Sequence, residues 1–450
     1  MNDERYNYLI SANVGRAVTR MAIPAIITML VTSLYNIADT FFVGQIDTQS
    51  TAAVGVVFPV MFVAQAVSFF FGHGSGNYIS RELGAKRVEN ASRMMATGFF
   101  YGLGAGVLIM VLGLLFLTPL SVSLGSTPTI LPYTVRYLRI ILLGTPLLTS
   151  SLVLNNQFRL QGYATAGMWG VLSGAILNII LDPIFIFTLD MGVEGAAWAT
   201  VIGQLCSLAV MLVLTRNGKT LPIIPKHFTP SRAFAVEIVA GGSPSLLRQL
   251  LSAVATLLLN VAAAHYGDAA VAAMTIANRI CMFIMSGMLG LGQGYQPLCG
   301  FCYGAGLMDR VKQGFWFCVR VGTIALLCFT ILGFMFTRPI VAVFRDDPAV
   351  IAIGIDALRW QLCTFPLCAL FIYSNMMMQT CGMTWRANLL ASARRGLFFI
   401  PLILILPRLF ALTGVEMCQA ASDLCSFLLC LPILRSALQE LNHSGDTPQV

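Results

Sequence analysis

The sequence predicts an all-α polytopic membrane protein of twelve transmembrane helices, arranged as two six-helix lobes around a central cavity. Composition is the first reason, because 57% of the 450 residues are hydrophobic and only 10% are charged, with a mean hydropathy of +0.80. These values lie far outside the range of water-soluble globular domains. The second reason is a series of apolar runs long enough to cross a bilayer, which takes about 20 residues. The third is an internal repeat at a constant offset of 220 residues.

The apolar runs are bounded by glycine, proline and charged residues, which mark the ends of helices. No short apolar core followed by a cleavage site precedes them, so we expect the first run to direct membrane insertion. The predicted spans are 17–43, 52–79, 94–118, 130–157, 165–188, 192–215, 237–264, 269–298, 314–337, 349–378, 388–407 and 413–436.

One segment near the middle of the chain is typical of an exposed linker. Residues 216–236 combine four basic residues with three prolines, a composition that does not continue an apolar helix. This linker divides the chain into an N-terminal tail, an N-terminal lobe, the linker, a C-terminal lobe and a C-terminal tail. Their predicted bounds are 1–16, 17–215, 216–236, 237–437 and 438–450.

The basic residues predict the orientation in the membrane. Most of the Lys and Arg residues between the spans fall on the side that also carries both termini. Only four fall on the other side: Arg136, Arg338, Arg345 and Arg408. Because basic loops stay in the cytoplasm, both termini should be cytoplasmic. The net charge of +8 is therefore a topology signal, and no soluble basic domain is present to bind nucleic acid.

The repeat indicates that the two lobes share one topology. Each lobe has an even number of predicted spans, so an axis along the membrane normal relates them. Two such lobes enclose a central cavity, and rocking one against the other gives alternating access, which favours a transporter over a channel or an enzyme. The matching residues include Pro24 with Pro244, Gly72 with Gly292, Gly84 with Gly304, Asn155 with Asn375, and Gly162 with Gly382.

A carboxylate inside the first span is the leading candidate for coupling. Asp39 lies in the apolar run 17–43, where a charge costs about 2.5–3.5 kcal/mol on insertion scales. It should therefore face protein or water and needs a partner or a proton. The alternative is that Asp39 caps a helix end at the outer membrane surface.

Polar residues of the fifth and sixth spans are expected at the same depth. Asn178 and Asp182 are four residues apart, hence on one helical face, and Thr200 lies in the next span. With Asp39 they supply oxygen atoms that suit a hard cation such as Na⁺ or a shared proton. The possible Na⁺ ligands are Asp39, Asn178 and Asp182. The C-terminal lobe has no carboxylate deep in its first two spans.

Other residues have a functional and a structural interpretation. Pro24 removes a helix hydrogen bond, so the first span can carry a switchable kink or a fixed packing kink. Arg248, midway through its span, needs a partner or a wet cavity and is expected to line the cavity of the C-terminal lobe. His73 can sense pH or be a hydrogen-bonded structural residue. Cys299 and Cys302 have CxxC spacing but no second pair, which favours packing.

The segments SLYNIADTFFVG and LNIILDPIFIF, and the Gly-Ala pairs after spans two and eight, resemble the multidrug and toxic compound extrusion (MATE) family. The likeness is greatest to its branch with a cation site in the N-terminal lobe. By this resemblance Asp39, Asn178, Asp182 and Thr200 match cation-binding positions, and Pro24 matches a proline at which the first helix bends. Tyr35 and Asn155 match cavity positions near bound drugs. The acidic residues that another branch uses in the C-terminal lobe are not found here.

Together these observations predict a secondary antiporter that exports amphipathic, cationic organic compounds in exchange for Na⁺ or H⁺. We expect a monomer in the inner (plasma) membrane, with small-molecule substrates, membrane lipid around it, no nucleic-acid partner and no prosthetic cofactor. Two alternatives stay open. A flippase for lipids or lipid-linked sugars would keep the two lobes, and an embedded transferase would need a catalytic cluster that the sequence does not show.

Overall fold

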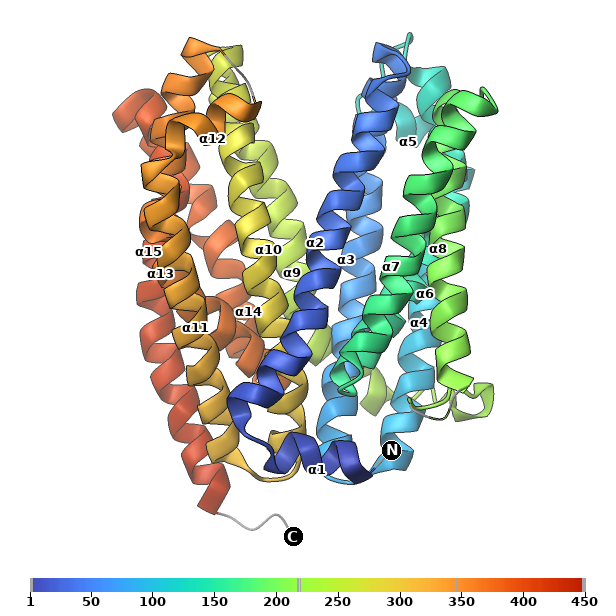
Figure 1. Cartoon of the computed structure of the whole chain (residues 1–450), viewed down its shortest axis with the longest axis vertical. Helices are drawn as coiled ribbons and strands as arrows, with labels where there is room; N and C mark the ends of the chain where they lie inside the picture. Colours follow the sequence, from blue (N-terminus) through green and yellow to red (C-terminus); the bar gives the residue numbers. More distant parts are fainter. Residues whose placement is uncertain (1–2, 217, 219, 345–346, 447–450) are drawn as a thin grey trace.

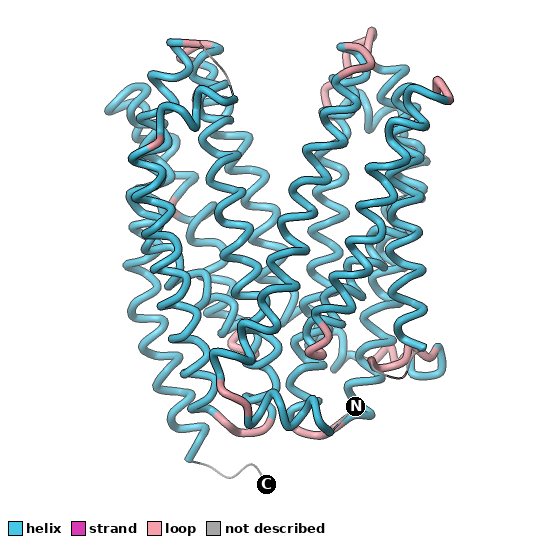
Figure 2. The backbone as a smooth tube through the Cα atoms, in the orientation of Figure 1, coloured by secondary structure: helices cyan, strands magenta, loops and turns pink. Residues whose placement is uncertain are grey.

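The computed structural model describes residues 3–216, 218, 220–344 and 347–446. Within these ranges the chain is helical and contains no strand, which confirms the predicted all-α class (Figure 2). The predictions that involve Lys219, Arg345 and the extreme ends of both tails lie outside the described residues.

The first half of the chain contains eight α-helices and one π-helical turn. Their bounds are α1 Asp3–Ser11, α2 Val14–Gly44, α3 Thr48–Gly84, α4 Val88–Leu115, α5 Leu117–Ser123, α6 Leu131–Leu160, α7 Ala164–Pro183, the π-helical turn Ile184–Thr188, and α8 Gly192–Arg216.

The second half repeats this pattern after a short 3₁₀ turn in the linker. Its elements are the 3₁₀ turn Pro225–His227, α9 Arg232–Ala264, α10 Asp268–Gly304, α11 Met308–Met335, α12 Thr337–Phe344, α13 Pro348–Thr380, α14 Thr384–Ser392, the π-helical turn Ala393–Leu397, and α15 Phe399–Asp446.

Local chemistry explains where several of these helices begin and end. At the start of α2 the side chain of Asn13 accepts a hydrogen bond from the backbone N–H of Arg16 at 3.3 Å, which satisfies a donor that has no partner inside the helix. After α6 and α13, Gly162 and Gly382 have φ angles of 82° and 81°, a conformation that favours glycine. Because these glycines occupy the same repeat position, the same turn closes the fourth span of each half.

Eleven stretches of the described chain are long and apolar enough to cross a membrane, instead of the twelve predicted. The first ten correspond one by one to predicted spans. The eleventh, Thr384–His443, contains both 388–407 and 413–436. Its 60 residues would extend about 90 Å as one straight helix, which is about three times the hydrocarbon core of a bilayer.

The chain reverses within this stretch, so it makes two passes. Ala411 has non-helical angles, φ 51° and ψ −132°, and a side chain added at Gly414 would overlap the backbone carbonyl of Leu406. Arg394 precedes Ala411 and Asp423 follows it, and the guanidinium Nε of Arg394 donates to a carboxylate oxygen of Asp423 at 2.7 Å. In a straight helix these two residues would be about 44 Å apart.

Three short helices were not predicted. The residues predicted as an N-terminal tail contain α1, and α5 and α12 follow the third span of each half. The residues predicted as a C-terminal tail continue the last helix as far as Asp446. Hydropathy did not indicate these segments, because each is too short or too polar to cross a membrane.

The helices form two bundles that are arranged as a V (Figure 1). One bundle contains α2 to α8 and the other contains α9 to α15. They diverge towards the end that bears α5 and α12, and they meet at the end that carries both termini. We call this second end the closed end. This arrangement confirms the predicted two-lobe architecture.

Glycines allow the bundles to meet closely at the closed end. A side chain at Gly84 of α3 would overlap the carbonyl of Phe301 in α10, and one at Gly304 would overlap the carbonyl of Arg81. Gly304 is the repeat equivalent of Gly84, and Phe301 is the repeat equivalent of Arg81. The two contacts are therefore equivalent under the 220-residue repeat. The repeat therefore builds a symmetric seam between the two bundles.

Polar contacts also join the bundles at this end. Arg159 of α6 donates to the carbonyl of Gln293 and to the side chain of Gln296, both at 2.9 Å. Arg81 and Glu237 form an ion pair at 2.7 Å. The seam is thus held by charge-assisted hydrogen bonds as well as by close helix packing.

Helix α1 lies across the closed end beneath both bundles (Figure 1). Its Tyr6 hydroxyl donates to the carbonyl of Gly84 at 3.2 Å. From the other bundle, Arg310 donates to the carbonyl of Ala12, just after α1, at 2.7 Å. The segment therefore contacts both halves of the molecule.

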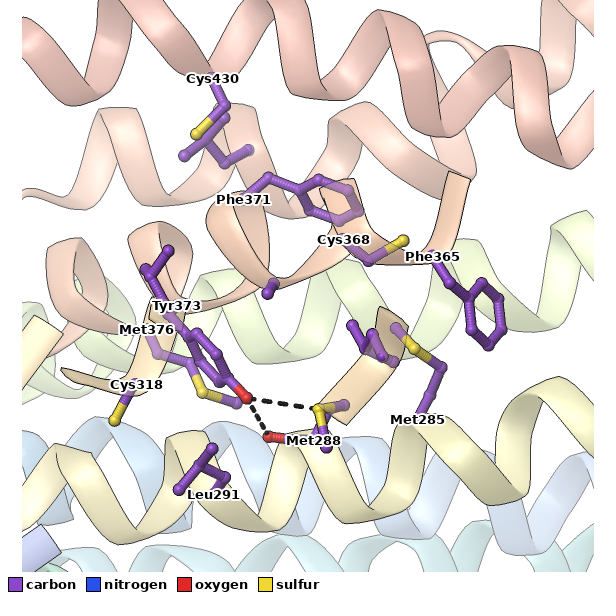
Figure 3. Close-up of a cluster of buried hydrophobic side chains, with 14 of the residues drawn as sticks. Met285, Met288, Leu291, Cys318, Phe365, Cys368, Phe371, Tyr373, Met376 and Cys430 are labelled. Carbon is purple, nitrogen blue, oxygen red and sulfur yellow. Dashed lines mark hydrogen bonds between the residues drawn. The ribbon is translucent and has the colours of Figure 1, made fainter. Parts of the chain in front are cut away.

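The core of the second bundle is rich in methionine, cysteine and aromatic side chains. Figure 3 shows Tyr373 of α13 directed towards Met288 of α10, whose carbonyl accepts its hydroxyl at 3.3 Å. Cys299 is buried, with its sulfur 3.7 Å from that of Cys381, and Cys302 is buried as well. All twelve cysteines lie in the described part of the chain, and none forms a disulfide there.

Candidate cation-binding site

The predicted site residues come from three adjacent helices of the first bundle, α2, α7 and α8. Helix α7 packs along both of the others. A side chain added at Gly174 of α7 would lie 2.5 Å from the carbonyl oxygen of Gly203 in α8, and one added at Gly203 would lie 2.8 Å from that of Gly174. Only glycine permits this approach, and it sets the polar side chains of α7 and α8 against each other.

The structure brings the four predicted residues together. The amide of Asn178 donates to the hydroxyl of Thr200 at 3.4 Å, and Asp182 lies one turn farther along α7, fully buried. From α2, the carboxylate of Asp39 is close enough to Asp182 for the two groups to interact electrostatically. Tyr35, one turn before Asp39, lines the same cavity as Thr200.

Four side-chain oxygens of this cluster are buried and have no hydrogen-bond partner among the described residues. They are Oδ1 of Asp39, Oδ1 of Asn178, and both carboxylate oxygens of Asp182. A buried acceptor without a partner costs about 1–3 kcal/mol, and more if it is charged. A cation, protons on the carboxylates or ordered water would satisfy these oxygens.

The chemistry of these donors fits a hard monovalent cation or a proton. Two carboxylates, one amide oxygen and nearby hydroxyls are all oxygen ligands, as hard cations prefer. Among the described residues no group of three or more His, Cys, Asp and Glu side chains is placed to hold a metal ion. The donor set thus resembles neither a zinc site nor another transition-metal site.

A cavity of about 160 Å³ borders the cluster. Tyr35, Asn178 and Thr200 line it as well as contributing to the cluster. The opposite wall is apolar and aromatic, with Phe58 and Phe62 of α3. A molecule in this cavity would therefore contact the same side chains as a cation in the site.

Two of the remaining predicted residues lie outside this group. Asn155 is not among the residues that line the cavity, since its amide packs against Gly167 at the corner between α6 and α7. Arg248 is half-buried in α9, and its guanidinium donates to Asn375 at 3.2 Å and to Ser245 at 3.4 Å. Their roles in a substrate cavity remain predictions.

Pro24 lies in the interior of α2, fifteen residues before Asp39, and the helix continues through it. The hydroxyl of Thr28 donates to the Pro24 carbonyl at 2.8 Å. His73 is buried, with one ring nitrogen 3.1 Å from Arg159 and the other 3.2 Å from the carbonyl of Phe69. These contacts fit its structural interpretation.

Two buried polar residues that connect helices, Arg159 and Asp423, are not among the predicted site residues. Arg159 lies between two predicted spans, yet it joins the bundles. Asp423, in the last predicted span, pairs with Arg394. A carboxylate within an apolar run was the available signal for Asp423, as it was for Asp39.

Comparison with known proteins agrees with the fold and the repeat. The MatE family model matches residues 24–184 and 244–407, two ranges that begin 220 residues apart. Multidrug export protein MepA of Staphylococcus haemolyticus (strain JCSC1435) is 30% identical over 434 residues, which cover 95% of each chain.

Two solved structures are similar to most of the chain. A crystal structure of MATE in the bent conformation has a TM-score of 0.92 at 26% identity, covering 98% of this chain and 99% of the other. An outward-facing multidrug resistance MATE transporter has a TM-score of 0.90 at 28% identity, covering 97% and 98%.

These matches extend over nearly the whole chain, and the family consists of transporters rather than enzymes, which sets the transferase alternative aside. The chain belongs to the MatE (multidrug and toxic compound extrusion) family of membrane transporters.

Proposed function

We propose that this multi-pass membrane protein is a secondary antiporter that exports amphipathic organic compounds in exchange for Na⁺ or H⁺. The name of the MepA relative, a multidrug export protein, supports efflux over lipid flipping. The observation that carries the proposal is the cluster of four buried, unpartnered oxygens of Asp39, Asn178 and Asp182, which lies beside a cavity. A cation or protons would satisfy these oxygens.

Exchange follows from the residues that the cluster and the cavity share. Tyr35, Asn178 and Thr200 face both, so a bound cation and a bound substrate contact the same side chains. Binding of one then weakens binding of the other. This is the coupling that an antiporter needs, because each ligand favours release of the other.

Helix α2 is the element that can carry the change of occupancy to the rest of the molecule. It holds Asp39 and Tyr35 at the site, and Pro24 interrupts its hydrogen bonding below them. A helix can bend at such a proline. We propose that loading the site with a cation or a proton changes the bend and so the shape of the cavity.

The cavity supports an amphipathic substrate. Its wall is mainly apolar, and the side-chain oxygen of Gln204 in the wall has no partner among the described residues. The volume of about 160 Å³ is below the roughly 300–1,000 Å³ of typical ligand sites, so we propose that the cavity holds part of the substrate. The two nearby carboxylates favour the cationic substrates expected from the sequence.

The placement of basic residues supports an orientation with both termini in the cytoplasm. Arg81, Lys86, Arg87 and Arg93 all lie at the closed end, and basic residues favour the cytoplasmic side. The bundles then diverge towards the outside, as in an outward-facing state.

We also propose the predicted boundaries of the two lobes, a location in the plasma membrane, function as a monomer and the lack of a prosthetic cofactor.

Efflux from proteoliposomes tests the proposal. The full-length protein is reconstituted, and export of a fluorescent organic cation is followed with a sodium gradient or a proton gradient imposed separately. We expect one of the two to drive export. Asp39→Asn and Asp182→Asn should each reduce it at least tenfold, because the site can no longer hold the same charge.

Asp190→Asn is the matched control. Asp190 is exposed in the loop after the π-helical turn and has a φ of 50°, which asparagine tolerates. Export by this variant should equal that of the wild type. Unimpaired export by both site variants would exclude the assignment of the cluster as the coupling site.

A further inference from the structure

A second recess lies on the outside of the molecule, between α2 and α11 near the closed end. It is an open groove of about 800 Å³, and we call it the α2–α11 groove. It is separate from the candidate cation site, since the two share no lining residue. Its polar lining includes Tyr8, Asn13, Arg16, Thr19 and Arg20.

Two arginines dominate the charge of this groove. Arg16 and Arg20 are four residues apart on α2, so they project from one face of the helix. Both are exposed, and neither forms an ion pair with any described carboxylate. The guanidinium of Arg20 lies over the ring of Tyr8, 4.9 Å from its centroid, which helps to hold it in place.

Many other basic residues at this end of the molecule already have partners within the protein, so the two arginines differ from them. Arg310 donates to backbone carbonyls around α1. The ion pairs at this end are Arg81 with Glu237, Arg87 with Glu82, Arg93 with Glu89, Lys312 with Asp309, and Arg386 with Glu440.

The lining of the groove also has an apolar part, contributed by both helices. Gly15 lets α2 approach α11 so closely that a side chain there would lie 2.9 Å from the ring of Phe317. Farther along α2, beyond Arg20, Ile23 lines the groove with 53% of its surface exposed. The groove thus combines two cationic groups with exposed apolar surface, as expected of a site at a membrane surface.

We propose that the α2–α11 groove binds an anionic phospholipid, with its phosphate on Arg16 and Arg20 and its acyl chains along Ile23. Arginine forks bind phosphate oxygens in pairs, and basic pockets between membrane helices bind anionic head groups. The lipid would lie against the first turns of α2, just before Pro24. This inference does not depend on the transport activity.

Lipid binding to the purified full-length protein tests the proposal. Native mass spectrometry in a neutral detergent compares phosphatidylglycerol with phosphatidylcholine of the same acyl chains. We expect the wild type to bind phosphatidylglycerol at least fivefold more tightly. The double variant Arg16→Gln/Arg20→Gln should lose this preference, and the control Arg232→Gln/Arg435→Gln, which removes two exposed arginines elsewhere, should keep it.

Two further arms separate a lipid site from simpler explanations. Soluble glycerol phosphate should not displace phosphatidylglycerol at equal concentration, because it has no acyl chains to bind the apolar part of the groove. Thr19→Glu places a carboxylate between the two arginines and should also abolish the preference, which provides a test if the double variant does not fold. Equal binding of both lipids by the wild type, a preference retained in Arg16→Gln/Arg20→Gln or Thr19→Glu, or displacement by glycerol phosphate would each overturn the proposal.

Discussion

Asp423 of the second bundle and the aspartates of the candidate site differ in whether the protein supplies them with partners. In the second bundle, Asp423 accepts from Arg394 at 2.7 Å, from Gln419 at 2.6 Å and from Thr364 at 3.4 Å. In the first bundle, both oxygens of Asp182 and one of Asp39 have no partner among the described residues. The first carboxylate therefore has partners that fit a structural role, and the other two have oxygens available for the proposed cation or proton.

This contrast predicts opposite effects of the same substitution. Asp423→Asn leaves Arg394, whose side chain is only 18% exposed, without a counter-charge and should destabilise the protein by about 3–5 kcal/mol. Asp39→Asn removes a buried charge that has no described cationic partner, so stability in the absence of Na⁺ should be unchanged or higher. Thermal unfolding of the purified variants in sodium-free buffer measures both. An equal loss of stability in the two variants would contradict the assignment.

At the scale of elements, the molecule depends on glycines that let long helices approach. Gly84 of α3 and Gly304 of α10 occupy equivalent repeat positions, and each faces a backbone carbonyl of the other helix. Gly174 and Gly203 do the same between α7 and α8. Helix packing by small residues is the usual means of close contact in membranes, and here it sets both the seam and the candidate site.

Alanine at the seam should therefore destabilise the protein. Gly84→Ala or Gly304→Ala would force α3 and α10 apart, and overpacking of this kind costs about 1–3 kcal/mol. Gly55→Ala and Gly287→Ala are matched controls in the same two helices, because an added side chain there meets nothing within 4 Å. In thermal unfolding, the two seam variants should have lower melting temperatures than the two control variants. Seam variants as stable as the controls would show that the helices can move apart without loss.

At the scale of the whole molecule, the V shape depends on contacts at one end. The bundles meet at the closed end through the glycine seam, through Arg159 and through the ion pair of Arg81 with Glu237. The segment containing α1 contacts both bundles there. Opening this end in an alternating-access cycle requires that these contacts break together.

Arg159→Met should make the closed end open more often, because it removes the hydrogen bonds to Gln293 and Gln296 and keeps an unbranched, flexible side chain. Cys302 is buried there, with its sulfur 3.8 Å from the carbonyl of Leu9. Its labelling by a maleimide, followed by peptide mass spectrometry, should become several-fold faster in the variant.

Labelling of Cys302 after denaturation serves as the reference for complete labelling, and Arg435→Met is the control substitution. Identical labelling of Cys302 in the wild type and in Arg159→Met would show that Arg159 does not hold this end closed.

The sequence by itself determined the spans, the repeat and the cluster of candidate residues, because each follows from local properties. Hydropathy over about 20 residues identifies a span, and a four-residue spacing places Asn178 and Asp182 on one face of a helix. Only the tertiary structure decided which carboxylates are neutralised, where the last two passes reverse at Ala411, and how Arg159 and α1 join the bundles. These features depend on groups far apart in the chain, and a residue pattern does not indicate which of them will meet.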